Sequence, residues 1–331
     1  MSPKQVAIYA RSLGRRVFGA NIAGRVNVKA LPVGIWNLNY MAQINGQKYV
    51  FKIYSKNIPD LLFGNNGKDE YLALELIRDL EIAPRPINFE FSELFGMEVL
   101  VYRYLEGTPL SEFTPVLLEN NAINLAKLHS FDIKPITILP KKIETTRTLM
   151  DEITSTFNRC IDLNIPPKKL ASYKHLIAKA KNYAKDVKES TPKYALTHGD
   201  LAPCNIIVYG TDVKFIDWQR PTITDPAFDV WAFAEDAFIR WDLAKPLTNE
   251  QKRIFIDKYI SLTDDAKIMD RMRLKSPLYY LNIGLYCLMR YHDFLSGRID
   301  RSRTKGREHL WKKYDTTEKV CSLKLKEVFQ S

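Results

Sequence analysis

The residues with the clearest chemical potential lie in one stretch, residues 198–229, which reads HGDLAPCNIIVYGTDVKFIDWQRPTITDPAFD. In it Asp200 stands five residues before Asn205, and Asp217 follows two short apolar runs that a turn separates. This pattern predicts a hairpin of two strands, each with a polar side chain at one end whose oxygen could bind a ligand. One acid can act as a base, while an amide and a second acid can hold a divalent ion. Phosphoryl transfer from a nucleotide needs that set of groups.

The same stretch suggests a role for each polar residue. Asp200 is the candidate catalytic base, which would accept or orient the proton of an attacking hydroxyl. Asn205 and Asp217 are candidate metal ligands, because hard oxygen ligands suit Mg²⁺. His198 is expected to shape the loop through hydrogen bonds. A Cys–His enzyme is the alternative, since Cys204 lies close to His198 in the sequence.

Elements upstream of this stretch must position a nucleotide if the chemistry is correct. Alternating residues predict strands over 26–31, 40–44 and 48–54. A loop with Gly34 lies between the first two strands, and its backbone N–H groups could approach phosphates. Lys52, in the third strand, could meet the phosphate charge as a point cation. An ordinary lysine facing outwards would give the same local pattern.

A helical pattern over 68–82 and an apolar strand over 97–104 follow. Glu70 lies near the start of the helix, where a carboxylate could simply favour the helix dipole. The strand leads into Leu105-Glu106-Gly107, which predicts a glycine turn between two parts of the chain.

Taken in order, these motifs resemble the aminoglycoside phosphotransferase and choline kinase family, small-molecule relatives of protein kinases. The resemblance rests on H-G-D-L-x-x-x-N at 198–205, I-D-W at 216–218 and D-P-x-x-D at 225–229, and it runs from about Val26 to Trp241. It implies an α+β, two-lobed protein-kinase-like fold. Residues 1–104 would form a nucleotide-binding lobe with a basic N-terminal helix over 3–18 and an antiparallel sheet. Residues 105–331 would form a mainly helical catalytic and substrate lobe with a short catalytic hairpin and a basic tail. The implied cofactors are ATP and Mg²⁺.

The resemblance also implies which residues meet the nucleotide. They are Gly34, Asn37, Lys52, Glu70, Arg103 and Leu105. Glu70 would pair with Lys52, with Glu75 as the competing candidate. The hinge would offer the carbonyl of Arg103 and the amide of Leu105 to the adenine, so side-chain identity matters little there.

Recognition of the acceptor is less specified. Asp229 and Asp236 are candidates to line a site for an amine-bearing substrate, although Asp229 could instead tie its helix to the catalytic loop. Aromatic residues at helical spacing could hold a quaternary ammonium group, but such residues are more often core. The sequence departs from the family at Gln219, where many relatives carry an acid, and at Cys204, where glycine is common. The first departure bears on substrate contacts.

The composition limits the class of protein that this sequence can encode. The chain has 331 residues, of which 46% are hydrophobic, enough for a substantial core. It contains no apolar run of about 18 residues, so we expect no transmembrane helix. The N-terminus lacks the apolar run of an export signal, and the four cysteines are far apart in the sequence. A cytoplasmic protein with reduced thiols is therefore expected.

The net charge of +11 is concentrated at the two ends. Nine basic residues precede the first acidic residue, Asp60, and the segment Arg298–Lys326 holds ten basic residues against four acidic ones. Such ends could contact RNA or an anionic surface, although a solvated surface is the alternative.

These observations favour an ATP- and Mg²⁺-dependent phosphotransferase that acts on a hydroxyl of a small molecule. An aminoglycoside, a choline-like compound, a sugar and a nucleoside all remain open as acceptors. One alternative is a kinase that acts on RNA or another polyanion through the basic ends. Another is a non-catalytic nucleotide-binding regulator, against which the complete set of polar residues argues.

Overall fold

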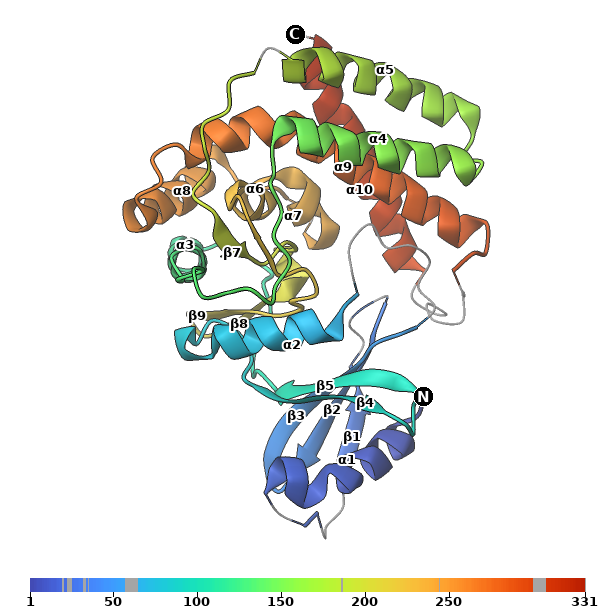
Figure 1. Cartoon of the computed structure of the whole chain (residues 1–331), viewed down its shortest axis with the longest axis vertical. Helices are drawn as coiled ribbons and strands as arrows, with labels where there is room; N and C mark the ends of the chain where they lie inside the picture. The colour runs from blue at the N-terminus through green and yellow to red at the C-terminus, as the bar shows by residue number, and fades with distance from the viewer. Residues whose placement is uncertain are drawn as a thin grey trace.

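The computed structural model describes residues 1–19, 21–22, 26–31, 34, 36–56, 65–185, 187–243, 245–299 and 308–330. The helices are α1 (Pro3–Phe18), α2 (Gly67–Leu76), α3 (Pro115–His129), α4 (Thr146–Asp162), α5 (Pro167–Lys185), α6 (Ala227–Ala234), α7 (Asp236–Asp242), α8 (Asn249–Thr263), α9 (Ile268–Leu295) and α10 (His309–Gln330). The strands are β1 (Asn27–Ala30), β2 (Leu38–Ile44), β3 (Gln47–Ile53), β4 (Pro86–Ser92), β5 (Met97–Arg103), β6 (Thr108–Pro109), β7 (Ala195–Thr197), β8 (Ile206–Tyr209), β9 (Asp212–Phe215) and β10 (Thr222–Thr224). An antiparallel sheet dominates the N-terminal lobe, and helices dominate the C-terminal lobe (Figure 1).

The N-terminal sheet has the order β1-β2-β3-β5-β4, with antiparallel neighbours throughout. Asn45 and Gly46 join β2 to β3 with φ angles of 50° and 78°, the left-handed values that suit a tight hairpin. Helix α1 buries Val6 and Leu13 in a core that it shares with the sheet. The helix and the three expected strands are thus present. Strand β4 was not predicted; it lies at the sheet edge, and its register shifts between Pro86 and Asn88.

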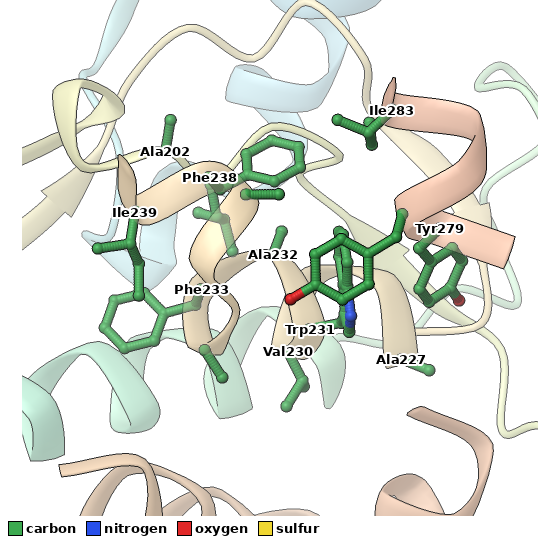
Figure 2. Close-up of a cluster of buried hydrophobic side chains, with 14 of the residues drawn as sticks. Ala202, Ala227, Val230, Trp231, Ala232, Phe233, Phe238, Ile239, Tyr279 and Ile283 are labelled. Carbon is green, nitrogen blue, oxygen red and sulfur yellow. The ribbon is translucent and has the colours of Figure 1, made fainter. Parts of the chain in front are cut away.

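The C-terminal lobe packs around an aromatic core. Figure 2 shows Trp231 of α6 beside Tyr279 of α9, and Phe233 and Phe238 nearby. The Trp231 and Tyr279 ring centroids are 5.2 Å apart, and both side chains are almost completely buried. Burying an aromatic side chain of this size contributes roughly 2–3 kcal/mol to stability. These aromatic residues are therefore core, and not a ligand cage.

Some element boundaries differ from the expectation. The helix expected over 68–82 ends at Leu76 and continues as a short 3₁₀ turn, Arg78–Leu80. Asp225 precedes α6, and its Oδ1 accepts the Ala227 N–H at 3.0 Å. It also forms a buried ion pair with Arg271 of α9, at 3.0 Å, which no local pattern indicated. None of the described helices has both the length and the apolar character needed to cross a bilayer.

The chain passes from one lobe to the other beside the hairpin β8–β9. Strand β6 pairs with β8, so Thr108 faces Val208. Gly107 has a φ of 126°, and a Cβ built there would lie 2.3 Å from the Val208 carbonyl oxygen. Only glycine permits that approach. The end of the N-terminal sheet is thereby held against the hairpin that carries the candidate site.

Candidate active site

Lys52 of β3 and Glu70 of α2 form a buried ion pair, with 2.6 Å between Nζ and Oε2. The Tyr54 hydroxyl donates to the same carboxylate oxygen at 2.6 Å. The competing candidate, Glu75, pairs with Arg78 of its own helix instead. The N-capping side chain of Asn66 starts α2 at the place that brings Glu70 against the sheet. The structure therefore places Glu70, and not Glu75, against the lysine.

The Lys52 ammonium also contacts Asp217, which follows β9 in the other lobe. Burial alone would lower the pKa of Lys52, but the charges of Asp217 and Glu70 outweigh burial and hold it above its usual value. Burial would raise the pKa of Asp217, but the Lys52 charge and hydrogen bond keep it low. Both groups are therefore charged. One lysine thus links an acid of the N-terminal lobe with an acid of the catalytic hairpin.

Asp217 adopts a backbone conformation that is unusual for a residue with a side chain. Its φ is 66°, in the left-handed region, which costs roughly 1–2 kcal/mol for a residue other than glycine. Strain of this kind concentrates at functional sites. Gln219, the departure from the family noted above, contacts the Asp217 carboxylate through its side-chain amide.

Asp200 and Asn205 lie together on the loop that precedes β8. The Asn205 Nδ2 donates to the Asp200 Oδ2 at 3.0 Å and to its backbone carbonyl at 2.9 Å. Burial, and then the charge of Asp217, raise the pKa of Asp200 to about 6. The N–H of Ile216 donates to the Asn205 carbonyl at 2.8 Å, which sets Asn205 beside the strand that ends at Asp217. The three polar residues of the opening stretch are therefore neighbours in space.

Asp229 of α6 holds this loop through hydrogen bonds to its backbone. Its carboxylate accepts the backbone N–H of His198 at 2.6 Å and that of Gly199 at 2.8 Å. The Nε2 of His129, at the end of α3, lies 3.2 Å from the same carboxylate. Asp229 has 0% exposure, so an acceptor cannot reach it. The expectation that Asp229 contacts substrate is wrong, and the alternative, a tie between its helix and the catalytic loop, describes its contacts.

His198 and Cys204 do not form a nucleophilic pair. The His198 Nε2 lies 3.0 Å from the Ile216 carbonyl, and its Nδ1 accepts the Asp200 N–H at 3.2 Å. These contacts require the neutral tautomer with its proton on Nε2, and burial lowers the His198 pKa accordingly. Burial, with the nearby Asp242 charge, raises the pKa of Cys204 well above its usual value. The Cys–His alternative is therefore wrong, because the thiol stays protonated and the imidazole is occupied.

Gly34 and Asn37, both expected near the nucleotide, have different surroundings in the structure. Gly34 has a φ of 98°, and a Cβ there would lie 3.3 Å from the Asn39 side chain. Asn37 is buried, and its side chain accepts the Ser55 N–H at 3.2 Å and exchanges hydrogen bonds with Asn65. We had expected Asn37 to bind the nucleotide. Its polar atoms are satisfied within the protein, so we correct its role to support of the loop.

The expected hinge begins at the end of strand β5. The Arg103 N–H donates to the Arg85 carbonyl at 2.9 Å, while the Tyr104 N–H donates to the Lys48 carbonyl on the other side at 3.1 Å. In an extended strand, the N–H and C=O of one residue point to the same side and residues two apart repeat that direction. The Arg103 carbonyl therefore points to the same side as the Arg103 N–H, whereas strand β5 ends at Arg103 and the direction of the Leu105 amide stays a prediction. The Arg103 side chain lies elsewhere, stacked on Tyr49 at 4.6 Å.

Comparison with known proteins now decides the family. A model of the phosphotransferase enzyme family matches residues 27–268, which include Lys52, Glu70, Asp200, Asn205 and Asp217. The chain belongs to this family. It is 22% identical, over 196 residues, to a protein LicA homolog of Mycoplasma capricolum subsp. capricolum, a match that covers 59% of this chain and 68% of that protein.

Solved structures of several kinases share the fold. A spectinomycin phosphotransferase in complex with ADP and spectinomycin has a TM-score of 0.66 and 15% identity, over 97% of this chain and 98% of that chain. An ethanolamine kinase of Plasmodium vivax has a TM-score of 0.67 and 18% identity, over 97% and 89%. A choline kinase of Cryptosporidium parvum has a TM-score of 0.60 and 16% identity, over 96% of each chain. The α+β, protein-kinase-like fold is confirmed, and the protein is a phosphotransferase.

Acidic residues of α7 take an unexpected place in this phosphotransferase. Asp236, expected near the substrate, starts the helix, and its carboxylate lies 3.7 Å from Lys324 of α10. Asp242 ends the same helix, about 9 Å farther along its axis. It accepts the Cys204 N–H at 2.8 Å and pairs with Lys313 at 2.6 Å. Sequence reasoning missed Asp242, although an acid at a helix C-terminus opposes the helix dipole and can mark a tertiary role.

The donor set suits one kind of metal site. Among the described residues, no group of three or more His, Cys, Asp or Glu side chains could hold a metal ion. Mg²⁺ needs no such group, because it is commonly held by one or two protein oxygens together with substrate phosphates and water. The Asn205 Oδ1 accepts only a long contact from the Cys204 thiol, at 3.6 Å, and Lys52 and Gln219 contact only one oxygen of Asp217. The residues present therefore fit a phosphate-bound Mg²⁺.

Proposed function

We propose that this phosphotransferase moves the terminal phosphate of ATP to a hydroxyl group of a small molecule, with Mg²⁺. One observation carries the proposal. The Lys52 ammonium contacts both Glu70 and Asp217, and Asp200 and Asn205 lie on the loop next to Asp217. A cation for the phosphates, two oxygen donors for a metal and a carboxylate base therefore meet at one place, as phosphoryl transfer needs.

The nucleotide would lie between the lobes. The Arg103 carbonyl and the Leu105 amide would bind the adenine, and Lys52 would bind the phosphates while Glu70 holds its side chain. Gly34 would let its loop approach the phosphates. The lobe division between residues 104 and 105 is part of the same proposal. The solved relative that holds ADP supports this placement through its shared fold.

Asn205 and Asp217 would hold Mg²⁺, each through a side-chain oxygen. Once bound, the ion would neutralise the charge that develops on the transferred phosphate. Asp217 would do so while remaining in contact with Lys52, so the metal and the lysine would share one carboxylate.

Asp200 would act on the acceptor. Asn205 donates to its Oδ2, which leaves Oδ1 to accept the proton of the acceptor hydroxyl. As the new O–P bond forms, the bond between the terminal phosphate and ADP breaks. The proton passes to the Asp200 oxygen and ADP leaves. A pKa of about 6, raised by burial, makes Asp200 a stronger base than a carboxylate in water, yet still ionised at neutral pH.

The basic residues of helix α1 are not among the residues of this site. Helix α1 packs on the N-terminal sheet, and Arg16 pairs with Glu90 of β4 at 2.6 Å. We therefore propose a small-molecule acceptor in preference to RNA. We also propose a cytoplasmic location, which suits ATP as cofactor and the four free cysteines.

An assay of ADP release tests the proposal. The purified protein should release ADP from ATP in the presence of Mg²⁺ when a suitable hydroxyl compound is added, and chelation of Mg²⁺ should abolish that release. Binding of ATP without acceptor-stimulated release, for every compound in a broad panel, would instead indicate a non-catalytic regulator.

A further inference from the structure

A pocket of about 350 Å³ opens beside the segment that follows Asp217. Side chains from the start of α2, from α4, from α9 and from residues 219–222 surround it. Its lining includes Asp69, Lys142, Glu152, Gln219, Arg220 and Asn282. The volume lies at the lower end of the range for small-molecule sites, so it suits an acceptor about the size of one or two sugar rings.

This pocket adjoins the candidate catalytic groups. Gln219, in its wall, contacts the Asp217 carboxylate. Arg220, also in its wall, packs against the loop of the candidate base: a Cβ on Gly199 would lie 3.0 Å from the Arg220 carbonyl oxygen. The Arg220 charge also opposes the rise in the pKa of Asp200 that burial and Asp217 cause. A molecule in the pocket would thus lie beside the residues proposed to act on it.

Among the residues of the lining that the structure describes, the charges balance. Lys142 and Arg220 are basic, and Asp69 and Glu152 are acidic. Lys142 and Glu152 pair with each other at 2.8 Å. A lining of this kind has no net charge with which to select a polycation or a polyanion. The remaining polar lining consists of amides and hydroxyls, among them Asn282 and Thr156, whose Oγ1 lies 3.5 Å from the Asn282 Oδ1.

Aromatic faces, which a quaternary ammonium group requires, are not offered here. No aromatic residue occurs among the described residues that line the pocket. Tyr286, four residues after Asn282 on α9, already lies beside a protein cation, Arg290, whose guanidinium is 5.5 Å from its ring centroid. The same guanidinium lies 5.9 Å from the Trp36 ring, and Lys313 lies 5.7 Å from the Trp241 ring. Each of these three rings therefore already has a cation of the protein against one face.

The geometry points to a neutral, hydroxyl-rich acceptor, such as a sugar or a cyclitol, bound in this pocket and not to a choline-like or polycationic one. Amides and hydroxyls can each donate to or accept from the hydroxyls of such a compound. Asn282 and the exposed hydroxyl of Ser155 set specificity by hydrogen bonding, while Gln219 and Arg220 form the wall next to Asp200. The inference rests on the proposed function and adds the class of acceptor.

A panel of acceptors gives the first test. ADP release by the full chain with MgATP is measured with a hexose, a pentose, an inositol, choline, ethanolamine and an aminoglycoside. We expect the highest kcat/KM for one of the three hydroxyl-rich neutral compounds. A higher kcat/KM for choline, ethanolamine or the aminoglycoside would overturn this inference and leave the proposed function standing. No stimulation by any of the six would overturn both.

Variants of the pocket give the second test, with the best neutral acceptor. Asn282→Leu keeps the size of the side chain and removes its hydrogen bonds, so KM for the acceptor should rise about tenfold with little change in the KM for ATP. Ser155→Ala, which removes one exposed hydroxyl of the lining, should shift the same KM in the same direction if Asn282→Leu does not fold. Asn182→Leu, on the exposed face of α5, is the matched control and should leave both KM values unchanged. Equal acceptor KM values for the pocket variants and the control would contradict the assignment.

Discussion

The Nζ of Lys52 and the Oε2 of Glu70 lie 2.6 Å apart, and the side chains are only 3% and 1% exposed. This ion pair joins strand β3 to helix α2, and both of its charges are buried away from water. Removing one partner of such a pair leaves the other buried and unpaired, which costs more than the pair contributes when intact.

Lys52→Met should therefore lower the free energy of unfolding by about 3 kcal/mol, because Glu70 and Asp217 lose their shared cation. Urea unfolding without nucleotide measures the change. Lys48→Met is the control on the same strand: Lys48 pairs with Glu106 at 2.7 Å, but both side chains are exposed and screened by water, so the loss of stability should be much smaller. Equal losses of unfolding free energy in the two variants would show that the buried pair stabilises the protein no more than the exposed pair does.

Asp229→Asn should loosen the catalytic loop. The carboxylate accepts the N–H groups of His198 and Gly199, and an amide offers only one acceptor oxygen for the two. We expect a loss of about 2 kcal/mol in stability and faster hydrogen exchange at those two amides. Asp236→Asn, on α7, should leave their exchange unchanged. Unaltered exchange in Asp229→Asn would mean that the loop does not depend on this anchor.

The sequence predicted the local features of the site well. Asp200, Asn205 and Asp217 come together because a hairpin with a short turn carries all three, and the hairpin could be identified from apolar runs and a glycine turn. The lysine strand followed from alternation in the same way. The pairing of Glu70 with Lys52 was implied by the family resemblance, since no local pattern joins residues 18 positions apart.

Features that depend on burial could not be predicted. Asn37 and Asp229 carry the polar atoms of ligand-binding residues, and only packing shows that protein groups satisfy them. Asp242 and Arg220 were missed because each reaches the site through a tertiary contact, from the end of α7 and from the segment after Asp217. In each case a neighbour that is distant in the sequence decides the role.

His198 should make stability depend on pH. Burial lowers its pKa below the ordinary value of about 6.5. Above that pH neither the folded nor the unfolded state protonates it, and its contribution is fully present. As pH falls below about 6.5 the unfolded state binds the proton first, so stability falls by at most about 1.4 kcal/mol per pH unit.

Urea unfolding at pH 7.5 and pH 5.0 tests this expectation. The decrease between the two pH values should be smaller in His198→Asn than in the wild type, because asparagine does not titrate. His175→Asn, on the exposed surface of α5, should keep the decrease of the wild type. The same decrease in all three proteins would exclude His198 as its source.

Cys204 should be dispensable for chemistry. Its thiol is held protonated by burial and by the Asp242 charge, so it is a poor nucleophile. Cys204→Ala should retain turnover within about twofold, as expected for a side chain outside the reaction, and iodoacetamide at pH 7 should not inactivate the wild type. Turnover in Cys204→Ala that falls as far as in Asp200→Asn would show that the thiol takes part.

The central claim is that Asp200 is the base for the acceptor hydroxyl, and Asp200→Asn tests it most directly. The substitution keeps the shape of the side chain and its contact with Asn205, so MgATP should still raise the melting temperature as it does in the wild type. Turnover, measured as transfer of labelled terminal phosphate to a saturating acceptor, should fall by about 10²–10⁴-fold, the contribution typical of general base catalysis. Full turnover in Asp200→Asn would contradict the account.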